Sequence, residues 1–165
     1  MGKVKTGQLA YIGVGANVGD RQGNISAAIA KLRESPNVEV LRMSTLVDNP
    51  AVGGPAGSPS FLNGAVEVST SLSARELLDR LFEIERSLGR ERRLKWGPRT
   101  IDLDLLLFGD QIIAEPGITV PHALLHERTF VLQPMNEIAP NVIHPTLRKS
   151  MAELLAQISK SKSSE

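Results

Sequence analysis

Two aspartates in an otherwise apolar segment are the residues of this sequence best suited to hold a metal ion. Asp102 and Asp104 alternate with leucine and isoleucine in residues 100–108 (TIDLDLLLF). If this segment is a β-strand, both carboxylates lie on one face, about 7 Å apart. Carboxylates that close repel each other, and a hard divalent cation such as Mg²⁺ relieves the repulsion. The alternative is an exposed strand edge, where aspartates only keep the strand soluble.

The segment before this strand carries a local excess of positive charge. Residues 86–99 contain one acidic residue, Glu91, whereas the formal net charge of the whole chain is only +1. The basic residues of this segment are Arg86, Arg90, Arg92, Arg93, Lys95 and Arg99. Such a cluster beside metal-binding carboxylates suits a polyphosphate, because the cations contact phosphate oxygens and the carboxylates hold the bridging Mg²⁺. Trp96, in so polar a segment, is expected to cover a ring or seal a closed site.

Two other interpretations of the basic segment remain open. A solvated loop is the more common outcome for a charge run taken alone. A nucleic-acid surface would need several aromatic side chains for base stacking. The chain has one Trp, one Tyr and four Phe, which weakens that interpretation.

Glycines and histidines give weaker signals. The glycines within residues 13–19 match neither the dinucleotide fingerprint nor a P-loop. Tight packing is the favoured interpretation, and a close approach of this turn to a ligand is the alternative. His122 and His126 are four residues apart, the spacing of a metal pair on a helix. Pro121 precedes them, however, and separate roles are expected. His144, before a proline, is expected to be structural.

The elements that would position these residues alternate between strands and helices. Apolar or alternating runs predict strands at residues 8–15, 38–43, 62–68 and 100–108, with weaker strand signals at 111–113 and 118–120. Helical spacing of apolar residues predicts a helix that ends at residues 35–37, and capping boxes predict helices after Ser73 and Ser150, the first ending at Gly89. Residues 49–60 hold three prolines and three glycines and predict a long loop.

The order strand, helix, strand, strand, helix, strand is that of the ferredoxin-like βαββαβ arrangement, an α+β fold with an antiparallel sheet. In the strand of residues 100–108, the side chains that alternate with the aspartates should enter the core together. These are Ile101, Leu103, Leu105 and Leu107.

Composition indicates one ordinary globular domain. The chain has 165 residues, of which 41% are hydrophobic and 22% charged, and we expect a domain at residues 8–158 with flexible tails at 1–7 and 159–165. No cysteine is present, which excludes disulfides, thiolate metal sites and cysteine nucleophiles. No apolar run has transmembrane length and the N-terminus lacks a secretory signal. We therefore expect a cytoplasmic protein without membrane, nucleic-acid or obligate protein partners.

Several separate motifs resemble the 6-hydroxymethyl-7,8-dihydropterin pyrophosphokinase family of the folate pathway. Residues 90–104 (RERRLKWGPRTIDLD) look like its signature. The likeness runs from about Tyr11 to about Pro145 and includes residues 11–17 (YIGVGAN), 61–63 (FLN), 120–122 (VPH) and 137–140 (EIAP). The resemblance implies a ferredoxin-like fold that extra C-terminal elements extend to three layers, α/β/α. It also implies transfer of the terminal pyrophosphoryl group of the co-substrate ATP to the pterin's hydroxymethyl oxygen, which leaves AMP.

By position, the resemblance gives a role to each matching residue. Asp102 and Asp104 would bind two magnesium ions, and Arg90 and Arg99 would steady the phosphates during transfer. The other nucleotide-side positions are Glu85, Arg92, Lys95, Trp96, Leu105, Thr119, His122 and Arg128, with Arg99 shared. The pterin would lie between two aromatic side chains, with an amide at its polar edge. Its pocket would comprise Phe61, Phe130, Asn63, Asn49, Pro50 and Val52.

Three positions depart from the family pattern. Lys95 replaces an arginine, which keeps the charge but loses the bidentate fork. Asn49 replaces a common threonine, and Ala123 replaces a larger residue. None of these changes involves the aspartate pair, so we expect activity to survive.

Two non-enzymatic hypotheses stand beside the enzyme: a ferredoxin-like module that senses a nucleotide, and an RNA-binding domain of similar topology. The pair Asp102 and Asp104 argues against both, because two acids beside an arginine cluster hinder RNA binding and are unnecessary in a sensor.

Overall fold

The main structure is an antiparallel sheet of five strands. The computed structural model describes residues 7–17, 19–49, 60–89 and 101–163. The strands are β1 (Gln8–Ala16), β2 (Val38–Met43), β3 (Val47–Asn49), β4 (Phe61–Thr70) and β5 (Asp102–Phe108). They lie in the order β2-β4-β1-β5, and β3 pairs with the beginning of β4. The predicted ferredoxin-like α+β fold is confirmed, and β5 is an edge strand of the sheet.

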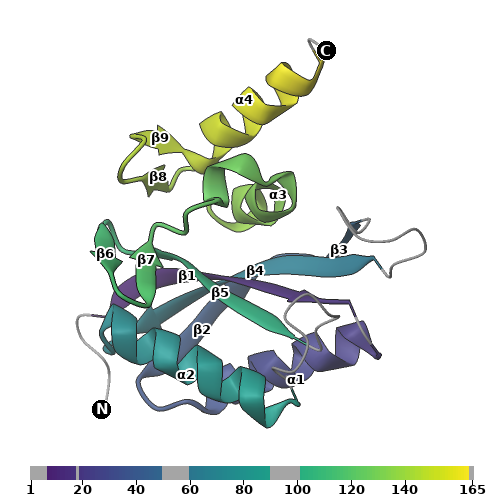
Figure 1. Cartoon of the computed structure of the whole chain (residues 1–165), viewed down its shortest axis with the longest axis vertical. Helices are drawn as coiled ribbons and strands as arrows, with labels where there is room; N and C mark the ends of the chain where they lie inside the picture. The colour runs from purple at the N-terminus through teal and green to yellow at the C-terminus, as the bar shows by residue number, and fades with distance from the viewer. Residues whose placement is uncertain (1–6, 18, 50–59, 90–100, 164–165) are drawn as a thin grey trace.

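Two helices, α1 (Arg21–Glu34) and α2 (Ala74–Ser87), cover one face of the sheet, as Figure 1 shows. The predicted capping box of α2 is present, because Ser73 and Glu76 each accept a hydrogen bond from the other's backbone N–H. Gly89, just past the helix, has a φ of 90°, which glycine adopts without strain. The most deeply buried large side chains of this layer are Ile12, Ile25, Leu32, Leu77, Leu81, Ile84, Ile101 and Leu103.

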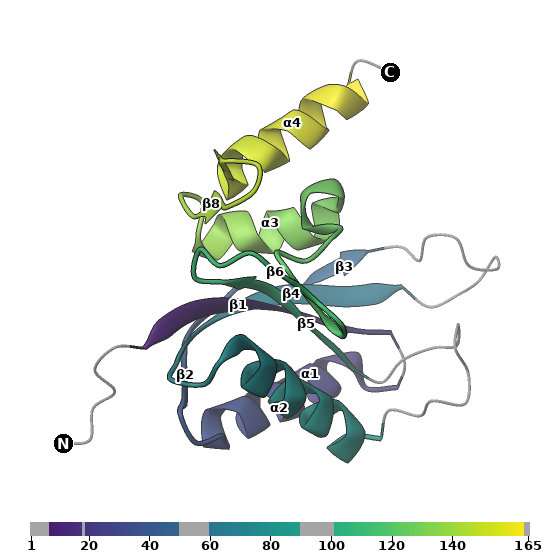
Figure 2. The same cartoon turned by 60° about the vertical axis from the view of Figure 1, so that its left-hand side comes forward.

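The opposite face carries α3 (Thr129–Ile138), with α4 (Met151–Ser163) packed on it, so the molecule has helices on both sides of the sheet (Figure 2). A second apolar cluster fills this side; its members include Leu106, Leu132, Met135 and Met151. The smaller elements are the strand pairs β6 (Ile113–Glu115) with β7 (Ile118–Val120) and β8 (Ile143–His144) with β9 (Lys149–Ser150), and the short helix η1 (Leu125–Glu127). Among the described residues, no helix is long and apolar enough to cross a membrane.

Polar contacts fasten α3 to the sheet. Arg42 Nη1 on β2 donates to the carbonyl of Ile138 at 3.1 Å, and its Nε lies 3.6 Å from the carboxylate of Glu67 on β4. Glu67 in turn accepts a hydrogen bond of 2.5 Å from the hydroxyl of Tyr11 on β1. Burial, and then the Glu67 carboxylate, raise the pKa of Tyr11 well above its ordinary value. The end of α3 is thereby tied to three strands.

Five features of the sequence prediction need correction. Leu107 joins the α3 side, because a register shift in the pairing of β1 with β5, beside Tyr11, turns the end of β5 over. The first strand of the β6–β7 hairpin is residues 113–115 rather than 111–113. Strand β3 was not predicted, and its last residue, Asn49, had been expected to begin the loop of residues 49–60. Helix α4 continues to Ser163, into a tail expected to be frayed from residue 159. Helix α3 was not predicted at all.

Candidate active site

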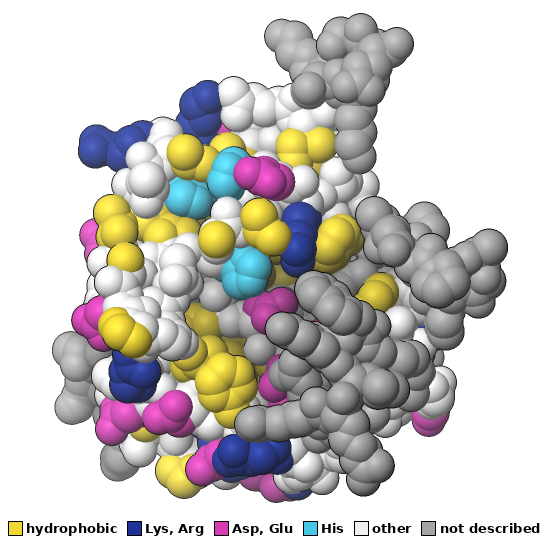
Figure 3. Space-filling model, in the orientation of Figure 1, with side chains coloured by type: hydrophobic (Ala, Val, Ile, Leu, Met, Phe, Trp, Pro, Cys, Tyr) yellow, Lys and Arg dark blue, Asp and Glu magenta, His cyan; other side chains and the backbone are white. Residues whose placement is uncertain are grey.

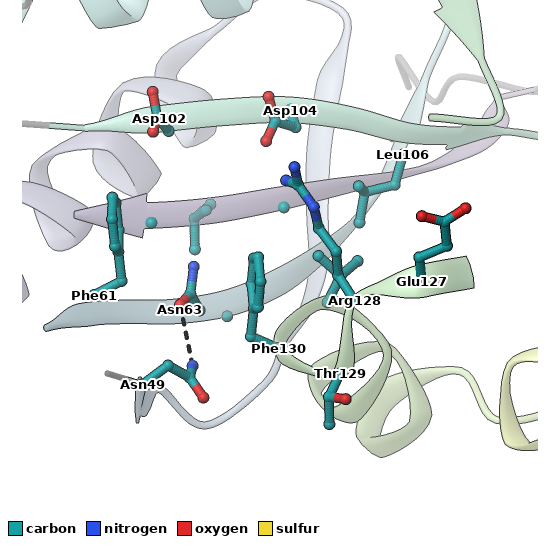
Figure 4. A pocket seen from close by; sticks show the side chains of 15 residues that line it. Asn49, Phe61, Asn63, Asp102, Asp104, Leu106, Glu127, Arg128, Thr129 and Phe130 are labelled. Carbon is teal, nitrogen blue, oxygen red and sulfur yellow. Dashed lines mark hydrogen bonds between the residues drawn. The ribbon is translucent and has the colours of Figure 1, made fainter. Parts of the chain in front are cut away.

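The two aspartates of β5 project from the same face of the sheet, as the alternation predicted. Asp102 is half-buried and Asp104 exposed, whereas Leu103 between them is buried on the α1–α2 side. Across the sheet, Asp102 pairs with Gly15 and Asp104 with Gly13. Because glycines face them, no neighbouring side chain of β1 fills the space beside the carboxylates. Although β5 is an edge strand, Figure 4 shows both carboxylates over a cleft.

This cleft lies between the sheet and the beginning of α3 and has a volume of about 660 Å³, within the range of ligand pockets. Figure 3 shows acidic, basic and histidine side chains together on this face of the molecule. The described lining residues are Gly13, Val14, Gly15, Asn49, Phe61, Asn63, Gly64, Asp102, Asp104, Leu106, Glu127, Arg128, Thr129, Phe130 and Val131. A cleft of this size admits one flat ring together with part of a longer ligand.

Two aromatic rings and an amide form a slot within the cleft. Phe61 begins β4 and Phe130 lies in the first turn of α3, and in Figure 4 the amide of Asn63 lies between them. Asn49 Nδ2 on β3 donates to Asn63 Oδ1 at 3.0 Å. A planar heterocycle matches such a slot, because its faces contact the rings while its polar edge reaches the amide.

The junction of η1 and α3 supplies the charged side of the cleft. Arg128 stacks near Phe130, with Cζ 5.5 Å from the ring centroid, and its guanidinium extends toward the Asp104 side of the cleft (Figure 4). Sequence reasoning missed Glu127 and Thr129, which flank Arg128 and line the same cleft. Their position beside a predicted site residue was the only signal in the sequence that could have found them.

Gly15 also lines the cleft. A Cβ built on Gly15 would lie 2.8 Å from Asn63 Nδ2, too close for a side chain to fit without moving the amide. Gly15 therefore makes room for a polar group of the slot, as the alternative of a close approach to a ligand requires.

A salt bridge closes the outer end of β3. Arg21, the first residue of α1, binds the carboxylate of Asp48 through both Nη atoms, at 3.0 and 3.1 Å, and also donates to the carbonyl of Ser60. The hydrogen bonds from Arg21 and Ser60 lower the pKa of Asp48 below its ordinary value. Asp48 and Ser60 directly precede Asn49 and Phe61, so this cluster, the Arg21 clasp, holds two pocket residues in place.

Two residues of the expected nucleotide side are buried away from the cleft. Glu85 on α2 is 3% exposed, and its Oε2 accepts a hydrogen bond of 2.7 Å from the backbone N–H of Leu103. Leu105 is 4% exposed and packs with the α1–α2 cluster. Glu85 therefore supports β5 from behind, at the residue between the two aspartates, and the side chain of Leu105 faces the core.

Thr119 and His122 do not line the cleft. Thr119 is exposed on β7. His122 donates its backbone N–H to the carbonyl of Leu106 at 2.9 Å. Leu106 lies on β5, two residues after Asp104, so this hydrogen bond anchors His122 beside that strand. Its Nδ1 accepts a hydrogen bond from Leu124 N, which leaves Nε2 as the protonated nitrogen of the neutral ring. The remaining predicted site residues, Pro50, Val52, Arg90, Arg92, Lys95, Trp96 and Arg99, lie outside the described residues.

Comparison with known proteins agrees with the motifs. The model of the family described as 7,8-dihydro-6-hydroxymethylpterin-pyrophosphokinase (HPPK) matches residues 11–140. The chain belongs to this family. Over 143 residues it is 43% identical to the 2-amino-4-hydroxy-6-hydroxymethyldihydropteridine pyrophosphokinase of Aquifex aeolicus, a match that covers 87% of this chain and 88% of that relative. The enzyme of the same description from Pseudomonas aeruginosa is 40% identical over 150 residues, covering 90% and 91% of the two chains.

Solved HPPK-DHPS structures share the fold. One, described as HPPK-DHPS in complex with substrates, matches with a TM-score of 0.75 at 13% identity, and the wild-type Plasmodium falciparum HPPK-DHPS with 0.73 at 15%. The matches cover 98% and 96% of this chain but only 45% and 46% of those chains. This chain thus spans less than half of these solved proteins, and at such low identity the likeness concerns the fold alone.

The charges of the cleft fit a divalent metal. Among its described lining residues, Asp102, Asp104 and Glu127 are acidic and only Arg128 is basic. These described residues by themselves carry an excess of negative charge, which would repel a polyphosphate and which bound divalent cations would offset. No cluster of three potential metal ligands exists among the described residues, so the aspartate pair would depend on phosphate oxygens and water to complete the coordination. That donor set, one or two carboxylates with substrate phosphates, is the usual one for Mg²⁺.

Proposed function

We propose that this protein transfers the pyrophosphoryl group of ATP to the hydroxymethyl group of 6-hydroxymethyl-7,8-dihydropterin, a step of folate biosynthesis. A bond forms between the hydroxymethyl oxygen and the β-phosphorus of ATP, the bond from that phosphorus to the α–β bridging oxygen breaks, and AMP and the hydroxyl proton leave. The observation that carries the proposal is a single cleft, in a chain of this family, that joins an aromatic and amide slot to a carboxylate pair.

Phe61, Phe130 and Asn63 are proposed to bind the pterin. The rings would hold the heterocycle between their faces, and the amide would fix its rotation, so that the hydroxymethyl group extends toward the aspartates. Positioning of this kind supplies much of the rate in phosphoryl-type transfer, because the attacking oxygen and the phosphorus must approach in line.

Asp102 and Asp104 are proposed to hold two Mg²⁺ ions together with the phosphates of ATP. When bound, these ions would neutralise the negative charge that resists attack on phosphorus. The glycines opposite the aspartates leave space for ions and phosphates on this face. The carboxylates themselves would keep the pyrophosphoryl group beside the pterin slot.

The basic residues are proposed to complete the nucleotide side. Arg128 is the only described one that lines the cleft, and its reach toward Asp104 suits a contact with a phosphate. For Arg90, Arg92, Lys95, Trp96 and Arg99 the proposal rests on the family resemblance. Thr119 and His122 would contact the nucleotide from beyond the described cleft lining. We also place the protein in the cytoplasm, without an obligate protein partner.

A product assay tests the proposed function. The protein is incubated with Mg²⁺, ATP and the pterin alcohol, and the nucleotides are separated. We expect AMP, formed only when the pterin is present. Formation of ADP would show transfer of a single phosphoryl group, and the absence of both products would favour the nucleotide-sensing module.

A further inference from the structure

The orientation of the Asn49 amide follows from one backbone group. Asn49 Nδ2 lies 3.3 Å from the carbonyl oxygen of Val47, within β3. A carbonyl oxygen only accepts hydrogen bonds, so the atom of Asn49 that faces it must be the NH₂ nitrogen. The same nitrogen faces the amide of Asn63 at 3.0 Å. This second neighbour must therefore present its own acceptor, Oδ1.

The orientation of Asn63 follows in turn. With Oδ1 directed to Asn49, the Asn63 NH₂ group points the opposite way, into the slot between Phe61 and Phe130 (Figure 4). Gly15, which is paired with Asn63, leaves room for this end of the amide, because a Cβ there would lie 2.8 Å from Nδ2. The NH₂ group thus occupies space that only a glycine leaves open.

We infer that Asn49 is a positioning residue that sets the hydrogen-bonding polarity of the pterin slot. Through it, Asn63 offers the ligand an N–H donor, so the ligand edge at this point must be an acceptor, such as a ring carbonyl oxygen or an unprotonated ring nitrogen. The NH₂ group of Asn49 does not contact the ligand in this arrangement, because it donates to Val47 and Asn63 instead. The inference rests on the proposed function, because it concerns the pterin-binding slot.

The decisive variant is Asn49→Asp, which has the same shape but offers only acceptors. Asn63 would then turn its NH₂ group toward the new carboxylate and its Oδ1 toward the ligand, where two acceptors would face each other. Asn49→Leu is the uncharged companion, since it removes the donor without adding charge. Asn141→Asp, at an exposed position outside the described cleft lining, controls for the added charge.

Pterin affinity is measured by calorimetric titration of 6-hydroxymethylpterin into each protein, saturated with Mg²⁺ and a non-hydrolysable ATP analogue. Affinity for the analogue is measured separately. We expect Asn49→Asp to weaken pterin binding about tenfold or more, because two acceptors then face each other at the ligand edge. Asn49→Leu should weaken binding less, because the Asn63 amide is then free to rotate and can still present its NH₂ group to the ligand. Analogue affinity and thermal midpoint should stay near those of the unaltered protein and of Asn141→Asp.

A spectroscopic readout separates positioning from a general structural role. In the unaltered protein the side-chain NH₂ resonances of Asn63 should shift when the pterin binds, and in Asn49→Asp they should be perturbed before any ligand is added. Pterin affinity that is unchanged in both Asn49 variants would overturn the inference while leaving the proposed function intact. An unaltered protein that binds no pterin would instead refute the proposed function.

Discussion

Asp102 and Asp104 occupy a strand whose other side chains are almost all buried, and their only cross-strand neighbours on β1 are glycines. Carboxylates in that position gain nothing from a neighbouring cation of β1. Two carboxylates on one face of a strand, together with substrate phosphates, are the donor set that Mg²⁺ commonly uses, and the proposed sites employ both aspartates.

Replacement of Asp102 by asparagine should abolish most of the activity while the protein remains folded. Asparagine preserves the shape but removes the charge that a hard cation requires, so we expect AMP formation to fall by about a hundredfold or more. Asp110→Asn, in the exposed turn after β5, is the matched control and should leave the rate unchanged. Substantial turnover of Asp102→Asn at ordinary Mg²⁺ concentrations would show that the metal assignment is wrong.

Glu85, on α2, contacts the same strand from the side opposite the cleft. Glu85→Ala leaves the buried N–H of Leu103 without this acceptor, which should lower the free energy of unfolding by about 1–3 kcal/mol. Urea unfolding measures the change. Glu83→Ala, on an exposed position of the same helix, should alter stability by less than about 0.5 kcal/mol. Equal stabilities of the two variants would contradict a supporting role for Glu85.

At the scale of elements, the pocket depends on β3, a strand of three residues that, within the described part of the chain, pairs with β4 alone. So short a strand has few ladder hydrogen bonds, and the Arg21 clasp adds side-chain bonds at its outer end. Because Asn49 belongs to β3 and Phe61 begins β4, the clasp influences the slot without lining it.

Arg21→Ala should therefore impair pterin binding selectively. An exposed ion pair contributes modestly, so we expect the KM for the pterin to rise roughly two- to fivefold while the KM for ATP changes little. High salt should reduce the difference between the variant and the unaltered protein, since salt screens such pairs. Arg33→Ala, exposed on the same helix, is the control. An equal rise in both KM values would show that the clasp supports the whole domain instead.

Helix α3 illustrates why some elements escaped prediction. Pro134 lies inside it and no side chain caps its beginning, and both features argue against a helix in the sequence. It forms because Leu132, Met135 and Ile138 are buried against the sheet. Packing outweighs local propensity here, and one consequence is that Arg128 and Phe130 come to the cleft together.

For the molecule as a whole, His144 should make stability depend on pH. Burial, and then the nearby ring of His126, lower the pKa of His144 below its ordinary value of 6.5. Its Nδ1 accepts backbone hydrogen bonds from Thr146 and Leu147, an acceptor that protonation of this nitrogen would remove. Below pH 6.5 the unfolded chain takes up the proton first, so the free energy of unfolding falls as the pH falls and is fully retained above that value.

Urea unfolding at about pH 7.5 and about pH 5.5 measures this effect. His144→Asn retains an acceptor for the turn but does not titrate, so its stability should change less between the two conditions. A variant with the same pH dependence as the unaltered protein would place the responsible group elsewhere.

The sequence by itself determined the strand alternation that puts Asp102 and Asp104 on one face, the capping boxes at Ser73 and Ser150, and the order of elements that defines the fold. These depend on neighbours within a few residues, where backbone geometry leaves little choice. The family motifs also identified the expected pocket residues, but they did not show how these residues are arranged in space.

The tertiary structure decided which of those residues share one cleft. It brought Asn49, Phe61 and Phe130 around Asn63, and it buried Glu85 behind the aspartates. Such outcomes depend on strand register and on packing between segments far apart in the chain, and local patterns carry no information about either. For the same reason, no motif reveals the direction of the Asn63 amide. It follows from the carbonyl of Val47 on β3, sixteen positions earlier in the chain, through the two hydrogen bonds that Asn49 donates.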